Sequence, residues 1–295
     1  MKTQRQNGSE KLSSGNKVAP FFSIIIPTLN EQEYLPRLLL ALTKQKFTSF
    51  EVIIVDAWSK DNTVKEAEKF SDVIPSLSIM QLKKRNIACQ RNFGAEKARG
   101  KYVVFLDADV NLFADYLQKI HVAIQEKKCS FLTTWGQADT KKRIDTTFVM
   151  LYNLVIEIEK AIDKPFSPGF NTIIRRDYFN KVKFWESLTL SEDYDFTSRA
   201  LKKGITLTIL RDPKVVISLR RFRSEGTFST ISRYTFANIY IMLKGPITNN
   251  LFEYSTGGHV HNKKKEEIYK KKLMQYLRVM QKIHKSVYDR LSKWE

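Results

Sequence analysis

The stretch Arg99-Gly-Lys-Tyr-Val-Val-Phe-Leu-Asp-Ala-Asp109 decides the fold class. Its apolar run from Tyr102 to Leu106 predicts a strand that is buried on both faces, as strands of parallel sheets are. The run leads directly into two carboxylates, Asp107 and Asp109. Because ligands of open α/β sheets bind beyond the carboxyl ends of the strands, this stretch predicts a site as well as a sheet.

Short β-rich runs and amphipathic helical stretches alternate on both sides of this strand. Further strands are predicted at Phe22–Ile26, Glu51–Val55, Leu77–Leu82, Ser130–Trp135, Thr206–Leu210 and Val215–Leu219, with a short one after the loop Pro165–Asn171. Helices are predicted after Asn30, which we expect to cap the first of them, after Asp61, and at residues 86–98, 114–125, 145–162 and 192–201. The alternation is typical of an α/β fold with a mostly parallel sheet flanked by helices.

Composition divides the chain into three parts. Residues 1–19 are expected to form a disordered polar tail, residues 20–219 the α/β domain, and residues 220–295 a basic helical extension.

No apolar run approaches the roughly 20 residues that a membrane-spanning helix needs, and the N-terminus lacks the apolar region of a signal peptide. Two cysteines, Cys89 and Cys129, do not suffice for a disulfide scaffold. We therefore expect a cytoplasmic protein.

The charge is strongly basic and unevenly distributed. The chain has 50 Lys+Arg against 31 Asp+Glu, a net charge of +19, and residues 211–244 and 259–295 alone carry +5 and +7. Such a balance implies an anionic partner. Apolar residues recur at helical spacing between Tyr269 and Trp294, so this extension is expected to dock on its own domain, contact a second subunit or lie peripherally on the inner face of the cell membrane. Aromatic residues at helical spacing do not suit base stacking, and we expect no nucleic-acid partner.

Polar residues follow three of the predicted strands. They are Pro27-Thr28-Leu29-Asn30-Glu31, then Asp56 with Asp61, then Asp107 with Asp109. The last pair offers hard oxygen ligands to Mg²⁺ or Mn²⁺, and such an ion would bridge the phosphates of a nucleotide diphosphate. The absence of a Gly-x-x-x-x-Gly-Lys-Ser/Thr loop and of a Gly-x-Gly-x-x-Gly turn argues against a P-loop ATPase and a dinucleotide-binding dehydrogenase.

These residues carry a resemblance to a known family. Ser23-Ile-Ile-Ile-Pro-Thr-Leu-Asn-Glu31, Glu51-Val-Ile-Ile-Val-Asp56 and Arg99 to Asp109 resemble the nucleotide-sugar half of a family 2 glycosyltransferase, an inverting family with the GT-A fold. Ser191-Glu-Asp-Tyr-Asp-Phe196, with Asn171 upstream, resembles its acceptor half. The resemblance extends from about Phe21 to Leu219.

The resemblance implies a role for each matched residue. Asp56 would bond to the nucleobase, and Asp107 and Asp109 would hold the ribose and the metal ion. The base and ribose pocket would be lined by Pro27, Thr28, Asn30 and Glu31, and the diphosphate would be approached by Arg91 and Asn92. This sequence has Ala57-Trp58-Ser59 after Asp56, where the family usually has Gly-Ser or Ser-Ser.

Asp193 is the predicted general base, supported by Glu192. In an inverting transfer a carboxylate takes the proton of the attacking acceptor hydroxyl, whereas the alternative is that both acids only cap a helix. An acceptor that is itself a lipid phosphate would make the base dispensable. Asn171, Arg220 and Arg221 are candidates for binding the diphosphate or the acceptor, although the arginines also fit a solvated basic turn.

The predicted function is metal-dependent, inverting transfer of a sugar from a nucleotide diphosphate sugar. The expected acceptor is a polyprenyl or dolichyl phosphate or a lipid-linked glycan at the cytoplasmic membrane face. Two alternatives stay open at this point. One is a nucleotidyltransferase, which also uses strand-end carboxylates and a divalent ion, and the other is a non-enzymatic polyanion-binding protein.

Overall fold

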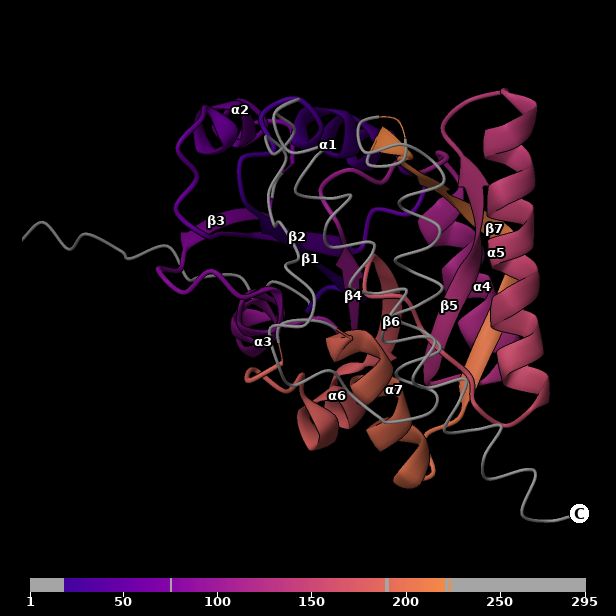
Figure 1. Cartoon of the computed structure of the whole chain (residues 1–295). Coiled ribbons are helices and arrows are strands. Elements are labelled where there is room, and N and C mark those ends of the chain that lie inside the picture. Colours follow the sequence, from indigo (N-terminus) through magenta and orange to yellow (C-terminus); the bar gives the residue numbers. More distant parts are fainter. Residues whose placement is uncertain (1–18, 75, 189–190, 221–222, 224–295) are drawn as a thin grey trace, which may run out of the picture. The chain divides into compact units, whose positions relative to one another are not determined.

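The computed structural model describes residues 19–74, 76–188, 191–220 and 223, all within one compact unit, Met1–Gly258. Figure 1 shows how their helices and strands are arranged. Residues 1–18 of the predicted tail, Arg221, and residues 224–295 of the predicted extension lie outside the described residues. The predicted boundaries of the three parts therefore stay predictions.

A seven-stranded sheet in the order β3-β2-β1-β4-β6-β5-β7 forms the centre of the described part. Its strands are β1 (Phe22–Thr28), β2 (Phe50–Asp56), β3 (Leu77–Gln81), β4 (Tyr102–Leu106), β5 (Phe131–Ala138), β6 (Asn171–Arg175) and β7 (Leu207–Ile217). All neighbouring strands are parallel except β6, which runs antiparallel to both β4 and β5. The prediction of a mostly parallel α/β sheet is confirmed, with one reversed strand inside it.

Helices cover both faces of this sheet (Figure 1). They are α1 (Leu35–Thr43), α2 (Thr63–Glu68), α3 (Ile87–Lys97), α4 (Tyr116–Lys127), α5 (Arg143–Ala161), α6 (Arg176–Val182) and α7 (Glu192–Lys202). All seven residues of β1 are buried, because a strand covered on both faces buries both sets of side chains. The run of isoleucines in β1 follows from this position, since β-branched side chains pack well on a pleated surface.

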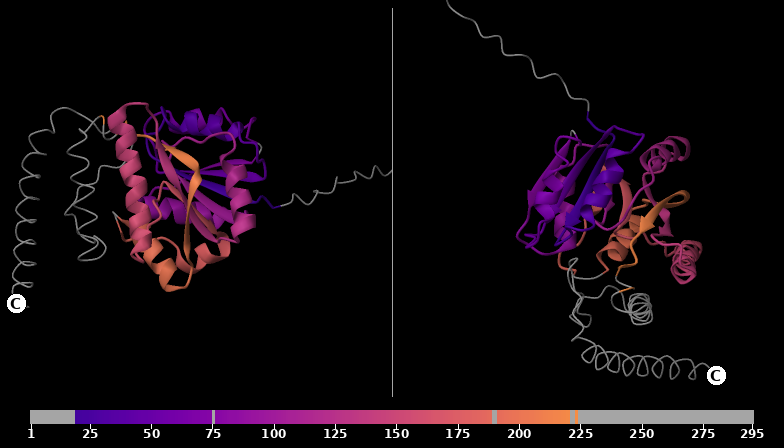
Figure 2. Two further views of the ribbon diagram at one scale, coloured as in Figure 1. Left: turned by 90° about the vertical axis from the view of Figure 1, so that its right-hand side faces the viewer. Right: turned by 90° about the horizontal axis from the view of Figure 1, so that it is seen from above.

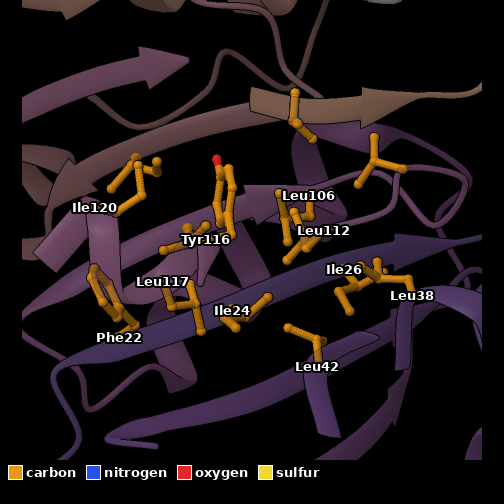
Figure 3. Packing of buried hydrophobic residues seen from close by; sticks show 14 of the residues in the cluster. Phe22, Ile24, Ile26, Leu38, Leu42, Leu106, Leu112, Tyr116, Leu117 and Ile120 are labelled. Carbon is orange, nitrogen blue, oxygen red and sulfur yellow. The ribbon is translucent and has the colours of Figure 1, made fainter. Parts of the chain in front are cut away.

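Two apolar clusters fill the space between sheet and helices. On one face, α1 and α4 contribute Leu38, Leu42, Tyr116 and Leu117 to a cluster with Ile24 (Figure 3). On the other face, α3, α6 and α7 pack on the sheet through the second cluster, in which the rings of β4, α6 and α7 meet at 5.2–5.8 Å between centroids. The sheet is thereby a rigid support for the residues at its edges.

Helix α3 lies unusually close to the sheet at Gly94. A Cβ atom at this position would lie 2.6 Å from Cγ2 of Ile25 on β1, so the approach requires glycine. This close packing brings the polar residues of the same helix, Gln90 and Arg91, to the carboxyl ends of β1 and β2.

Helix α5 stands beside β5 and has two different sides (Figure 2). On its inner side, the Asn153 side chain exchanges two hydrogen bonds with the backbone of Gly136, at 2.8 and 2.9 Å. On its outer side Ile144, Leu151 and Ile158 are 62%, 51% and 50% exposed. None of the described helices, α5 included, is long and apolar enough to cross a membrane.

Three local predictions differ from the structure. The two strands predicted at 206–210 and 215–219 are one strand, β7, which includes Asp212-Pro213 and pairs with β5 on both sides of an irregularity opposite Trp135. Asn30 does not cap α1, because it has a φ of 54° and the N-cap is Tyr34. The short helix α6 was not predicted.

Candidate active site

The polar strand ends that the sequence predicts to converge lie at one edge of the sheet. β1, β2 and β4 are parallel and end there at Thr28, Asp56 and Leu106. The reversed strand β6 begins there, with Asn171 opposite Leu106. Antiparallel pairing thus brings the loop 165–170 to the same edge, so residues from both halves of the domain meet.

Asp56 is the centre of the first group of residues. It is fully buried, and its Oδ1 accepts hydrogen bonds from the hydroxyls of Thr28 (3.0 Å) and Ser59 (2.5 Å). The Asn30 N–H donates to Ser59 Oγ at 2.8 Å, and Pro27 pairs with Val55 in β2. The residues predicted to line the base pocket therefore lie together.

Gln90 also belongs to this group, although no role was predicted for it. Its side-chain amide donates to the carbonyl oxygens of Thr28 (3.0 Å) and Val55 (2.7 Å), which ties the ends of β1 and β2 to α3. In the sequence, the signal for Gln90 was a polar residue among small residues on a helix face expected to be buried.

Trp58 stands where the sequence departs from the family. It has a φ of 56°, and its indole is 48% exposed and lies under the Lys83 ammonium.

Arg91 connects this edge to the second half of the domain. Its side chain is only 2% exposed, and its guanidinium binds Asp107 at 3.0 Å and Glu192 at 2.8 Å. Gly169 makes room for it, since a Cβ there would lie 2.7 Å from Arg91 Cζ. A carboxylate from the end of β4 and one from the start of α7 therefore share a single buried cation.

The predicted base, Asp193, is held by the backbone. Its Oδ2 accepts a hydrogen bond from Gly169 N–H at 3.0 Å and its Oδ1 one from its neighbour Tyr194 N–H at 2.9 Å. Burial raises the pKa of Asp193, which the backbone N–H groups and Arg91 partly oppose. Burial and the charge of Asp193 also raise the pKa of Glu192. A carboxylate with a raised pKa is suited to taking up a proton near neutral pH.

Glu31 and Asp109 share the second arginine of the site, Arg220, which follows β7. The Arg220 guanidinium binds both carboxylate oxygens of Glu31 at 2.6 and 2.7 Å and Asp109 Oδ2 at 2.9 Å, and it stacks 4.3 Å from the ring centroid of Tyr34. Burial raises the pKa of Glu31, and the bonds to Arg220 oppose this rise. The predicted diphosphate or acceptor ligand Arg220 thus lies beside the predicted metal ligand.

The donor set at this edge fits a divalent cation in part. Asp107 and Asp109 supply the oxygen atoms that Mg²⁺ and Mn²⁺ prefer. Among the described residues, however, no group of three or more His, Cys, Asp or Glu side chains is placed to hold a metal ion. The two carboxylates therefore suit an ion whose remaining ligands come from phosphate oxygens and water.

Two other predicted ligands are engaged within the protein. The Asn92 side chain exchanges hydrogen bonds with the backbone of Phe184, at 2.9 Å in each direction. Asn171 is fully buried, where it accepts a hydrogen bond from the Tyr116 hydroxyl (2.6 Å) and donates one to Thr134 (2.7 Å). These contacts favour structural roles for both residues, and Arg221 lies outside the described residues.

Helix α5 adds two polar side chains that the sequence did not single out, Tyr152 and Glu159. The Tyr152 hydroxyl and Glu159 Oε2 are buried and have no hydrogen-bond partner. The Tyr152 ring lies 6.1 Å from that of Phe170, next to Gly169. A spacing of two helical turns places Tyr152 and Glu159 on one side of the helix, and this was the signal in the sequence. On a mainly apolar helix, however, such a spacing predicts only packing in the core.

Known proteins resemble this chain in sequence. The model of the family described as glycosyl transferase family 2 matches residues 23–183. The poly(ribitol-phosphate) beta-N-acetylglucosaminyltransferase TarS of Staphylococcus aureus is 26% identical over 235 residues, which are 77% of this chain and 40% of TarS. The amylovoran biosynthesis glycosyltransferase AmsB of Erwinia amylovora is 31% identical over 215 residues, 65% of this chain and 67% of AmsB. The chain thus spans less than half of the length of TarS.

Solved structures resemble it in fold. The crystal structure of residues 1–349 of TarS in complex with UDP-GlcNAc matches with a TM-score of 0.57 and 25% identity, over 74% of this chain and 66% of that one. The mannosyltransferase PcManGT of Pyrobaculum calidifontis, in complex with GDP-Man and Mn²⁺, shares the fold with a TM-score of 0.59 at 18% identity, over 76% and 63% of the two chains. With the family model covering more than half of the sequence, this chain belongs to glycosyl transferase family 2.

Proposed function

We propose that the protein transfers a sugar to its acceptor with inversion at the anomeric carbon, and that Asp193 is the general base. One observation carries the proposal. The buried Arg91 guanidinium binds Asp107 on the nucleotide side and Glu192, the neighbour of Asp193, on the acceptor side. The candidate base and the candidate donor-binding carboxylate are therefore fixed relative to each other by one side chain.

In the proposed reaction, the Asp193 carboxylate takes the proton of an acceptor hydroxyl. The acceptor oxygen forms a bond to the anomeric carbon as the bond from that carbon to the phosphate oxygen breaks, and the nucleoside diphosphate leaves with the electron pair. The backbone N–H groups of Gly169 and Tyr194 orient the carboxylate for this task. The pKa of Asp193, raised by burial, makes it a better proton acceptor than an exposed aspartate.

The charged residues around the base have complementary roles in this proposal. Arg91 balances the carboxylates of Asp107 and Glu192, so that neither leaves an uncompensated charge beside the base. Asp107 and Asp109 would hold Mg²⁺ or Mn²⁺, which offsets the charge of the departing diphosphate when bound. Family membership favours this transfer of a glycosyl group over the transfer of a nucleotidyl group.

The test combines donor binding with transfer. We expect calorimetry with Mn²⁺ or Mg²⁺ to detect binding of UDP-GlcNAc or GDP-mannose, the donors seen in the related structures. With the donor that binds, Asp193→Asn should reduce transfer at least 100-fold with little change in donor affinity, and proton NMR of the product should show an inverted anomeric configuration. Undiminished transfer by Asp193→Asn would refute the assignment of Asp193 as the general base. Retention of the anomeric configuration in the product would refute inversion.

The proposed acceptor is a lipid-linked glycan or a lipid phosphate, reached from an anionic membrane surface, and of the two only the glycan offers a hydroxyl on which the Asp193 base would act. The outer side of α5 supports this setting, because exposed apolar residues at spacings of three, four and seven form a stripe: Ile144, Leu151, Val155, Ile158 and Ile162. Exposed basic residues flank its two ends at 141–143 and at Lys160 and Lys164. An apolar stripe with basic flanks is typical of helices that lie on anionic bilayers.

Vesicle binding tests this contact. Ile158→Glu should reduce co-sedimentation of the full chain with phosphatidylglycerol vesicles at least fivefold. Val122→Glu on α4, which also replaces an exposed apolar residue, should not. Equal binding of both variants and the wild type would refute membrane contact through α5, and a change of oligomeric state in Ile158→Glu would identify a second copy as the occupant instead.

A further inference from the structure

Three buried side-chain atoms in the described part have no hydrogen-bond partner: Arg91 Nε, the Tyr152 hydroxyl and Glu159 Oε2. Arg91 belongs to the candidate active site, and the Tyr152 ring lies beside Phe170, next to the Gly169 whose N–H binds the candidate base. Buried polar groups in native proteins are nearly always satisfied, so these exceptions call for a partner. A ligand bound beside α5 would supply one for Tyr152 and Glu159.

Tyr152 and Glu159 lie on one side of α5, and the Tyr152 ring lies beside the loop that holds the candidate base. They are seven residues apart, and two turns of helix place them on the same side. Between them Ile156 is buried in the core, which fixes this side of α5 toward the interior. The Tyr152 ring packs against Phe170 in the loop whose Gly169 N–H holds Asp193.

The charges around Tyr152 determine its protonation. Burial first, and then the carboxylates of Asp193 and Glu159, raise the pKa of Tyr152, so its hydroxyl keeps its proton and is a hydrogen-bond donor. Burial and the charge of Glu159 also raise the pKa of Tyr194, the residue after the base. The surface in front of Asp193 thus combines one donor with two carboxylates.

We propose that Tyr152 and Glu159 bind the acceptor, and that they select a neutral sugar or polyol hydroxyl rather than a lipid phosphate as the nucleophile. The inference rests on the proposed function and narrows its acceptor class. A hydroxyl both donates and accepts, so it can satisfy a carboxylate and a tyrosine hydroxyl at once. An ionised phosphate has no proton to give to the candidate base, and the Asp193 carboxylate repels it.

The arginines near the base do not reverse this preference. The Arg91 guanidinium is bound to Asp107 and Glu192, and the Arg220 guanidinium to Glu31 and Asp109. Each guanidinium is therefore already bound to two carboxylates of the site.

Transfer by the full chain to two kinds of probe tests the inference. With the donor that binds in calorimetry, octyl β-glucoside and octyl β-galactoside represent neutral hydroxyl acceptors, and farnesyl phosphate and phytanyl phosphate represent lipid phosphates. We expect transfer to a glycoside, and a rise of at least tenfold in its KM for Tyr152→Phe and Glu159→Gln. The donor Kd should stay within twofold, and Tyr178→Phe and Glu126→Gln serve as controls for the loss of a hydroxyl and of a carboxylate elsewhere.

Unfolding separates acceptor binding from a merely structural role. Because Tyr152→Phe removes an unsatisfied buried hydroxyl and Glu159→Gln removes a buried ionisable group, neither should lower the Tm of the protein without acceptor. A lowered Tm with parallel changes in donor Kd and acceptor KM would overturn the inference. Transfer to farnesyl phosphate would also overturn the inference if neither variant changed its rate. The inference would likewise fail if no glycoside accepted the sugar and none raised the Tm of the protein. If the wild type bound no nucleotide-sugar donor, the proposed function itself would be refuted.

Discussion

Replacement of Arg91 by methionine tests whether one buried cation holds the two halves of the site together. Its guanidinium is the link between Asp107, after β4, and Glu192, at the start of α7. Methionine retains much of the side-chain volume and removes the charge. We expect Arg91→Met to fold, to unfold at a much lower temperature than the wild type, and to lose transfer activity.

The magnitude follows from the geometry of the two ion pairs. At 2.8 and 3.0 Å, and with an effective dielectric constant of about 20, each attraction amounts to roughly 6 kcal/mol before desolvation. Desolvation of three charges offsets most of this, and removal of one partner of a buried pair typically costs about 3–5 kcal/mol. For a domain of this size, that corresponds to a fall in Tm of roughly 6–20 °C.

The loss should depend on pH in a definite direction. Burial and Asp193 raise the pKa of Glu192 in the folded protein, and Arg91 lowers it. Without Arg91 the folded state binds the Glu192 proton still more tightly than the unfolded state does, so stability falls as pH rises from the unfolded pKa to the folded one. The difference in Tm between Arg91→Met and the wild type should therefore be larger at pH 8 than at pH 5.

Thermal unfolding of wild type, Arg91→Met and Arg91→Met/Glu192→Gln at both pH values provides the measurement. The second substitution removes the uncompensated carboxylate, so it should recover at least half of the lost stability at pH 8. A fall below 3 °C in Arg91→Met, or no recovery in the double variant, would refute the view that Arg91 acts through charge balance.

Further predictions concern other parts of the same edge. Gly169→Ala should lose at least 100-fold in transfer and about 2 kcal/mol in urea unfolding, because its Cβ would lie 2.7 Å from Cζ of the enclosed Arg91. Asn171→Ala should cost about 2–3 kcal/mol in the same measurement, since two buried partners lose their hydrogen bonds, with the donor Kd unchanged. Burial raises the pKa of Glu159 to about 7, which disfavours its charged form, so Glu159→Gln should raise Tm relative to the wild type by roughly 2–4 °C at pH 8 and by less at pH 5. Arg220→Gln should tighten Mn²⁺ binding without nucleotide, measured by calorimetry, because one fewer cation competes for the carboxylates.

The sequence predicts the frame of the site because short-range patterns determine it. Buried strands have continuous apolar runs, and the carboxylates directly after them at Asp56 and Asp107 must lie at the edge where parallel strands end. For the same reason, the sheet and most helices lie within a few residues of their predicted positions. The strands predicted at 206–210 and 215–219 form one strand, β7, because pairing with β5 continues on both sides of Asp212-Pro213, although such a pair favours a turn.

The contacts made by long side chains could not be predicted in this way. Arg91 and Arg220 each reach carboxylates that lie far away in sequence, and no local pattern specifies such a partner. Asn171 was expected to contact a ligand, yet its position opposite Leu106 in the sheet turns it into the core. Tyr152 and Glu159 belong to a helix whose periodicity indicates only which side is buried, not that the buried side faces a base.

The two arginines also determine how ligands can enter this edge. In the absence of ligands, Asp107 and Asp109 are bound to Arg91 and Arg220, so a divalent cation that takes these carboxylates must exchange with a guanidinium group. Arg91 is buried and also bound to Glu192, whereas the Arg220 side chain is 13% exposed and follows the last strand. Exchange is therefore easier at Asp109 than at Asp107. An Arg220 guanidinium displaced from Asp109 lies beside the place where the diphosphate would bind, and bidentate pairing with phosphate oxygens is the interaction that guanidinium groups make best. Arrival of a cation with its nucleotide would thus convert a carboxylate-bound arginine into a phosphate-bound one, with little change in the number of charged contacts.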